Sequence, residues 1–216
     1  MKRIAVSQRV DVVPSYGERR DALDQRWAPL LLRAYLLPLL VPNDPETAAA
    51  LMTTFEPDGV LLTGGNDLSA YGGTVLERDR TEDILLDWAE ARARPVLGVC
   101  RGMQVLQHRF GVPLRPVTGH VTKRQSILLD GALVEVNSYH RMGAMTTSSA
   151  LEVFGRADDG VIKAVRHRTL PLIGIMWHPE REDPFVERDL ALLRTFFSGG
   201  YDRDAPPLGR SEKEIR

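Results

Sequence analysis

The chain has a single cysteine, Cys100, which lies in the stretch Gly98–Gly102 directly after a short apolar run. A cysteine here is either a small buried hydrophobic residue or a nucleophile held on a sharp turn from a strand into a helix. In the second role, Gly98 and Gly102 remove side chains that would collide across the turn. The helix after Cys100 would direct its positive end at the sulfur, and the Arg101 side chain would add positive charge. The pattern makes Cys100 a candidate nucleophile.

A thiol nucleophile needs a base and a group that orients the base, and one of the five histidines offers both. His178 ends an apolar run and precedes Pro179, which favours extended backbone at His178. Residues two apart in extended backbone share a side, so Glu180 can face with His178 and fix the imidazole tautomer. The alternative is a polar strand end without a catalytic role. Taken together with Cys100, the pattern predicts a Cys100–His178–Glu180 catalytic triad.

The glycine pair Gly64–Gly65 follows another apolar run, Gly59–Leu62. Glycines at the carboxyl end of a parallel strand leave backbone N–H groups sterically open to a ligand. The N–H of Gly65, together with that of Arg101 after the nucleophile, could bind an oxyanion. The alternative is a tight turn with no catalytic duty, which is common for paired glycines. We predict an oxyanion hole formed by the backbone of Gly65 and Arg101.

These residues need a sheet whose strands end at one edge, and the first half of the chain supplies the pattern. Apolar runs predict strands over residues 3–8, 35–42, 59–67 and 95–100, and amphipathic segments predict helices over residues 18–34, 44–55 and 79–93. Asp44 followed by Pro45 is a typical helix start. The alternation predicts an α/β fold with a mostly parallel central sheet flanked by helices.

The second half of the chain is expected to contain more strands than the first. A helix over residues 101–111 is followed by strands over residues 132–140, 151–157, 160–167 and 171–178, and by a last helix over residues 183–197. No internal repeat or linker divides the chain. We predict a single catalytic domain over residues 1–198 and a polar tail over residues 199–216.

Composition excludes several classes of function. The chain has 216 residues, of which 43% are hydrophobic and 26% charged, with a net charge of −1, so neither nucleic acid nor an anionic membrane is expected as a partner. The longest apolar stretch, Pro29–Pro42, is too short and too broken by Arg33 and Pro38 to span a bilayer. A lone cysteine cannot form an internal disulfide, which fits a cytoplasmic location. Metal-ligand spacings and a phosphate loop are absent from the sequence, so we predict no metal and no cofactor.

Three motifs in chain order, LTGGND at Leu62–Asp67, GVCRGMQ at Gly98–Gln104 and WHPE at Trp177–Glu180, resemble the class I glutamine amidotransferase-like superfamily. The residues CRG resemble its γ-glutamyl hydrolase branch, and the likeness runs from Val6–Arg9 to Glu182. It implies a flavodoxin-like core in which Cys100 attacks a γ-glutamyl carbonyl and water hydrolyses the glutamyl thioester. The implied contacts to a small-molecule γ-glutamyl substrate are Gly64, Asn66, Gln104, Asn137, Ser138, Tyr139 and His140. After His140, Arg141 and Met142 stand where many members of the branch have His-Gln.

What leaves the glutamyl group depends on other residues. Arg9, Arg19, Arg20 and Arg26 lie on or near the loop after the first predicted strand, at the sheet edge where ligands bind in open α/β folds. Such a cluster would suit an anionic leaving group such as a phosphate. The alternative is a solvated face in which Asp21 and Asp24 pair with the arginines. The chain is also similar to a narrower group, the γ-glutamyl-CDP-amidate hydrolases of bacterial capsule phosphoramidate biosynthesis, which implies glutamate and CDP-amidate as products.

Other functions fit the same motifs. The chain could hydrolyse another γ-glutamyl amide, such as γ-glutamyl-γ-aminobutyrate, or act as a glutaminase subunit that delivers ammonia to a partner synthetase. A catalytically silent binding protein on the same fold is a third hypothesis, which the three triad residues disfavour. Turnover of a γ-glutamyl amide other than glutamine by the purified chain alone would favour a hydrolase over a subunit.

Overall fold

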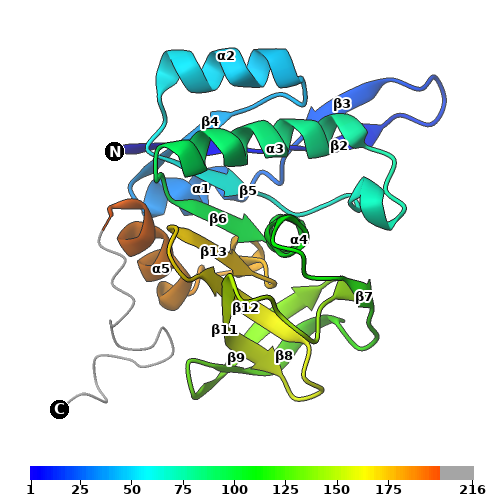
Figure 1. The fold of residues 1–216 in the computed structure, drawn as a ribbon, viewed down its shortest axis with the longest axis vertical. Coiled ribbons are helices and arrows are strands. Elements are labelled where there is room, and N and C mark those ends of the chain that lie inside the picture. Colours follow the sequence, from blue (N-terminus) through cyan, green and yellow to red (C-terminus); the bar gives the residue numbers. More distant parts are fainter. Residues whose placement is uncertain (200–216) are drawn as a thin grey trace.

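The computed structural model describes residues 1–199, and the rest of the predicted tail lies outside the described residues. Its centre is a nine-stranded sheet in the order β4-β1-β5-β6-β13-β12-β11-β8-β9, with helices on both faces (Figure 1). The α/β prediction is confirmed: β1 (Lys2–Val6), β4 (Leu36–Leu40), β5 (Gly59–Leu62), β6 (Val96–Val99) and β13 (Leu172–Ile175) are parallel neighbours. Every residue of β5, β6 and β13 is buried, which explains why their sequences are continuous apolar runs.

The helices cover the parallel half of the sheet. On one face α2 (Pro45–Phe55) packs against α3 (Leu76–Ala91), and α4 (Arg101–Arg109) lies beside β6 and β13; α1 (Trp27–Arg33) and α5 (Glu187–Phe197) cover the other face (Figure 1). The start of α2 is as predicted, because the Asp44 side chain accepts a hydrogen bond of 2.8 Å from the N–H of Thr47. Within residues 1–199, every helix is too short or too polar to cross a membrane.

The helix predicted over residues 18–34 is wrong in its first half. Residues Arg19–Ala22 form β3, which pairs antiparallel with β2 (Arg9–Val12), and α1 begins only at Trp27. Three of the four residues of β3 are charged and none is buried, so its sequence reads like the polar side of a helix. The hairpin extends from the sheet edge that carries the carboxyl ends of β1 and β5 (Figure 1).

The second half of the chain extends the sheet with antiparallel strands. These are β12 (Ile162–His167), β11 (Leu151–Ala157), β8 (Val121–Leu129) and β9 (Ala132–Tyr139). A small ladder joins β7 (Arg115–Pro116) to β10 (Met142–Gly143), and two short 3₁₀ turns are η1 (Ser69–Tyr71) and η2 (Pro179–Arg181). The antiparallel half thus approaches the end of β13, where His178 lies.

Candidate active site

Cys100 lies on the turn between β6 and α4, with a backbone φ of 54° that an L residue rarely adopts. A side-chain carbon added at Gly98 would overlap the carbonyl oxygen of Gly102, and one added at Gly102 would overlap the carbonyl oxygen of Leu62. Gly98 is therefore required for β6 to pack against the start of α4, and Gly102 for α4 to pack against β5. Cys100 is 7% exposed, and the first turn of α4 begins directly after it.

The structure brings His178 and Glu180 together beside Cys100. His178 Nδ1 lies 2.7 Å from Glu180 Oε1, and both residues are buried. A side-chain carbon added at Gly64 would lie 2.8 Å from His178 Cε1 and 3.5 Å from Cys100 Cβ, so both side chains face the same glycine. His178 Nε2 has no hydrogen-bond partner of normal geometry within residues 1–199. Burial works to lower the pKa of His178, but Cys100 and Glu180 together raise it to about 9, which favours imidazolium beside the sulfur.

One side chain fixes the backbone of His178. Asn137 accepts a hydrogen bond of 2.8 Å from the N–H of His178 and donates one of 2.8 Å to its carbonyl oxygen. The same amide donates to Glu182 Oε1 at 2.7 Å, which uses both of its N–H donors. Asn137 therefore holds the imidazole in place and has no amide donor left for a ligand, a role that sequence reasoning did not foresee.

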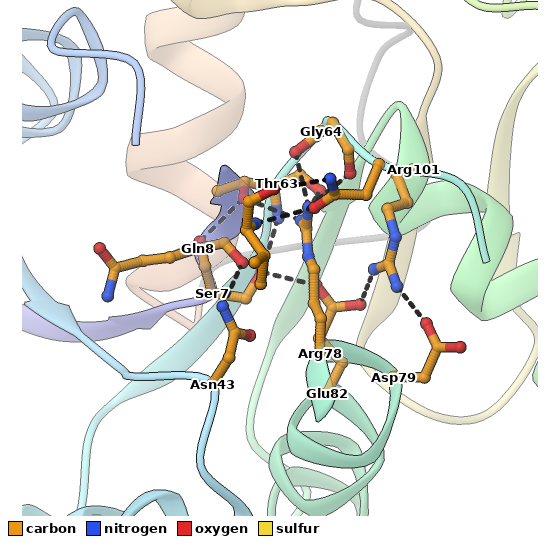
Figure 2. A network of polar contacts seen from close by, with 12 residues as sticks. Ser7, Gln8, Asn43, Thr63, Gly64, Arg78, Asp79, Glu82 and Arg101 are labelled. Carbon is orange, nitrogen blue, oxygen red and sulfur yellow. Dashed lines mark hydrogen bonds and ion pairs between the residues drawn. The ribbon is translucent and has the colours of Figure 1, made fainter. Parts of the chain in front are cut away.

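The predicted oxyanion residues lie on two neighbouring turns. Gly65 adopts a φ of 84° in the loop after β5, and the backbone N–H of Arg101 is at the first position of α4. The Arg101 side chain is 1% exposed and is paired with Glu82 and Asp79 (Figure 2). Because two carboxylates face its guanidinium, its charge is committed to that pairing rather than to the sulfur. Asn66 exchanges side-chain hydrogen bonds of 2.8 and 2.9 Å with the backbone of Val10, so it ties this loop to the β2–β3 hairpin.

The other predicted substrate contacts lie around β9 and α4. Gln104 donates a hydrogen bond of 2.9 Å to the carbonyl oxygen of Met142, and the Tyr139 ring lies edge-on to that of His178. Ser138 and His140 are buried, and both contact Lys163 Nζ, at 2.9 Å to Ser138 Oγ and 2.6 Å to His140 Nε2.

Lys163 is a residue that sequence reasoning missed. It lies on β12 and is 1% exposed. Burial lowers its pKa to about 7, against the opposing charges of Asp159 and Cys100. Burial and the neighbouring Lys163 lower the pKa of His140 to about 3, so His140 is neutral. The signal in the sequence was a lone lysine inside the apolar run 161–165.

All four predicted leaving-group arginines have partners within the protein, and the partner of Arg9 is Asp11. Arg19 pairs with Glu77, Arg20 lies 2.8 Å from Glu18 Oε1, and Arg26 donates to the backbone oxygens of Glu180 and Glu182. Asp21 and Asp24 do not pair with the arginine side chains as the alternative required. Asp21 instead accepts hydrogen bonds from Asn43, and Asp24 accepts one from the N–H of Arg26.

A cavity of about 240 Å³ lies against His178. Its lining includes the glycine pair Gly64–Gly65 and charged side chains of both signs, namely Arg9, Asp11, Asp24, Glu180 and Arg181. Arg9 pairs with Asp11, and the Arg181 guanidinium lies 4.8 Å from the centre of the Tyr139 ring. Arg181 was missed in the sequence, although it follows the WHPE motif directly. Within residues 1–199, no cluster of three or more His, Cys, Asp or Glu side chains could hold a metal ion.

Comparisons with known proteins show the family to which the chain belongs. The family model for class I glutamine amidotransferases matches residues 32–197. The chain is 30% identical to the γ-glutamyl-CDP-amidate hydrolase of Campylobacter jejuni over 90% of this chain and 97% of that protein. It is 26% identical to the γ-glutamyl-γ-aminobutyrate hydrolase of Escherichia coli over 85% of this chain and 86% of that protein. A solved Thermoplasma acidophilum structure, assigned to GMP synthase, covers 100% of this chain and 97% of its own, with a TM-score of 0.70 at 17% identity, and so shares the fold.

Proposed function

Because the chain belongs to the class I glutamine amidotransferase family, we propose that it is a cysteine-dependent hydrolase that cleaves a γ-glutamyl amide through a glutamyl thioester. The observation that carries the proposal is the buried His178–Glu180 pair, 2.7 Å apart, beside a thiol on a strained turn. The free Nε2 of His178 is the group that exchanges protons, since Nδ1 is bound by Glu180.

The reaction begins with the thiolate of Cys100 and the imidazolium of His178. The sulfur attacks the γ-carbonyl carbon, and the oxyanion that forms is bound by the N–H groups of Gly65 and Arg101. Collapse of the tetrahedral intermediate breaks the C–N bond, and the leaving nitrogen takes the proton from His178 Nε2. His178 then accepts a proton from water as the water attacks the thioester, and glutamate and the thiolate are released. Gln104 and the segment Asn137–His140 border the glutamyl side in this scheme.

We propose γ-glutamyl-CDP-amidate as the substrate, with glutamate and CDP-amidate as products in capsule biosynthesis. The likeness to the Campylobacter jejuni enzyme over nearly the full chain supports this choice. The cavity beside His178 also supports it, because Arg9 and Arg181 border it and guanidinium groups bind phosphate oxygens well. Arg19 and Arg20 are weaker candidates since, unlike Arg9 and Arg181, they are not among the residues that line the described cavity, and Arg26 supports the backbone of Glu180 and Glu182.

The first experiment measures glutamate release by the purified chain from γ-glutamyl-CDP-amidate, γ-glutamyl-γ-aminobutyrate and L-glutamine, with Cys100→Ala as the control for each. We expect strong preference for the nucleotide conjugate. Preference for γ-glutamyl-γ-aminobutyrate would replace the substrate and keep the hydrolase class. Activity on glutamine alone, or none without a partner, would favour an amidotransferase subunit, for which the 33% identity to anthranilate synthase component 2 of Azospirillum brasilense over 64% of this chain gives a precedent.

The arginine contacts have a separate test. Arg9→Ala and Arg181→Ala should each raise KM for γ-glutamyl-CDP-amidate by about 10-fold, as expected for the loss of a charge-assisted hydrogen bond. Both variants should leave KM for the uncharged leaving group of γ-glutamyl-p-nitroanilide nearly unchanged. Arg3→Ala, at the amino end of β1, is the control. Equal losses on both substrates would refute an anion site at these arginines.

A further inference from the structure

One buried arginine holds the loop that carries the glycine pair. Arg78 lies on α3 with 0% of its surface exposed, and Figure 2 shows its guanidinium against the loop after β5. It donates to three successive backbone oxygens, those of Thr63 at 2.8 Å, Gly64 at 3.1 Å and Gly65. It also contacts the side-chain oxygens of Thr63 and Asn66, both at 3.2 Å. A single side chain therefore fixes the orientation of three consecutive peptide groups.

The orientation of these carbonyls determines where the neighbouring N–H groups point. In a trans peptide, the C=O of one residue and the N–H of the next point in opposite directions. Because the oxygens of Thr63, Gly64 and Gly65 face Arg78, the N–H groups of Gly64, Gly65 and Asn66 face away from it. Within residues 1–199, none of these N–H groups donates a hydrogen bond to another protein atom.

The side away from Arg78 is the side of the thiol. Thr63, Gly64 and Gly65 line the cavity beside His178, and the α-carbon of Gly64 faces both His178 and Cys100. The backbone of Gly65 and Asn66 has φ values of 84° and 58°, which turns the chain so that successive peptides share this orientation. The unpaired N–H groups of Gly64 and Gly65 thus belong to residues that border the space where a carbonyl oxygen of a bound acyl group would lie.

A buried carboxylate connects this loop to the second turn of the site. Glu82 Oε1 accepts from Arg78 Nε at 3.0 Å and from Ser7 Oγ at 2.8 Å, and Oε2 accepts from Arg101 (Figure 2). Ser7 Oγ in turn accepts a hydrogen bond of 3.0 Å from the N–H of Thr63. Glu82 therefore braces Arg78 on one side and the side chain of Arg101, whose backbone N–H begins α4, on the other.

We propose that Arg78, anchored by Glu82, is a positioning residue that presents the N–H groups of Gly64 and Gly65 as part of an oxyanion hole. The inference rests on the proposed function in so far as the reaction passes through an oxyanion on an acylated Cys100. It adds the N–H of Gly64 to the Gly65 and Arg101 pair, and it assigns a role to a charged pair that makes no contact with substrate.

The test compares two reactions of Cys100 in Arg78→Lys. Lysine keeps the positive charge but cannot donate in fixed directions to three carbonyls. p-Nitrophenyl acetate acylates a thiolate through an oxyanion, whereas iodoacetamide alkylates it without one. We expect Arg78→Lys to slow acylation by about 10- to 100-fold, which is no more than the effect of losing one full oxyanion donor. The rate of alkylation should stay within about 2-fold of the wild-type rate. With γ-glutamyl-p-nitroanilide, kcat should fall by a similar factor while KM changes little.

Arg109→Lys is the matched control, because Arg109 pairs with Asp87 and Glu90 away from the site and should retain wild-type rates. If Arg78→Lys is poorly folded, Glu82→Gln provides the same comparison, since the neutral amide weakens the anchor and keeps its size. Wild-type acylation in a folded variant would overturn the inference, and so would a parallel loss of acylation and alkylation. A wild-type protein that is acylated by p-nitrophenyl acetate but hydrolyses no γ-glutamyl amide would refute the proposed function and leave this inference intact.

Discussion

Two buried polar clusters approach Cys100, and they balance their charges differently. In the first, on the α3 side, Arg78 and Arg101 face the carboxylates of Glu82 and Asp79 (Figure 2). In the second, on the β9–β12 side, Lys163 contacts Ser138 and His140, and the His140 ring stacks on that of His120. Within residues 1–199, the only carboxylate that contacts this second cluster is Asp159, which lies 2.9 Å from His120. Asp159 is 53% exposed, so solvent screens it.

This difference in charge balance changes what each cluster can do. Burial lowers the pKa of Arg78 only to about 10, because Glu82 opposes the effect, so Arg78 stays charged at neutral pH. Burial lowers the pKa of Lys163 to about 7, so the second cluster changes its charge near neutral pH. The first cluster therefore keeps its charge while it holds the loop Thr63–Gly65, and the second is a titratable neighbour of the thiol. The two kinds of environment meet at Cys100 and His178.

The largest effect is expected where the two clusters meet. Cys100→Ala should abolish turnover, a loss of at least about 10⁴-fold, because no other thiol is available to form the thioester. It should also lower the pKa of His178 from about 9, since Cys100 is the group that raises this pKa most. Glutamate release measures the first effect and an NMR titration of the imidazole measures the second.

His178→Ala should be nearly as severe in the same glutamate assay, and Glu180→Gln less so, because an orienting group is more replaceable than the base. Retained activity in Cys100→Ala would remove the triad assignment altogether. A pKa of His178 that does not move in Cys100→Ala would show that thiolate and imidazolium are not coupled in the resting protein.

Removing the carboxylate of the first cluster should cost the most stability. Glu82→Ala leaves two buried guanidinium groups without their shared partner, and we expect the free energy of unfolding to fall by about 3–5 kcal/mol. Glu90→Ala is the control, because its partner Arg109 is partly exposed and the loss should stay within about 1 kcal/mol. Urea unfolding of both variants measures the difference. Similar losses of stability in Glu82→Ala and Glu90→Ala would mean that the buried guanidinium groups depend on Glu82 no more than Arg109 depends on Glu90.

The sequence predicted the parts of this site that are marked by backbone requirements. Cys100 lies between two glycines that the turn needs, and His178 precedes a proline, so the neighbouring residues in the sequence identify both positions. The central strands β5, β6 and β13 were predictable because they are buried on both faces. Strand β3 and the first half of β8 are mostly polar and lack buried residues, so hydrophobic periodicity does not reveal them.

The two buried clusters were harder to predict, because a charged residue usually lies in solvent. Arg78 and Glu82 fall on the same stripe of α3 as Leu85, Leu86 and Ala89, all of them buried. That spacing was the available signal, but it becomes informative only once the stripe is known to face β5. Asn137 and Arg26 act on the backbone around His178 from far away in the sequence, at separations of 41 and about 154 residues. Such contacts depend on the completed fold rather than on local pattern.

The smallest expected effect is in the second cluster: the difference in stability between wild type and Lys163→Met should change sign with pH. Lys163→Met removes a buried amine, and at pH 6 it should leave stability unchanged or slightly increased, because burying the ammonium is costly. Above pH 7 the folded state releases a proton that the unfolded lysine, with an ordinary pKa of 10.5, still holds, so Lys163 makes the free energy of unfolding rise with pH. The variant lacks this rise and should therefore be the less stable protein at pH 9, where the neutral amine still bonds Ser138 and His140. Urea unfolding at both pH values measures the change. Lys123→Met, at an exposed position, is the control and should show no such change. A difference in stability between wild type and Lys163→Met that stays constant with pH would mean that the second cluster holds its charge as firmly as the first.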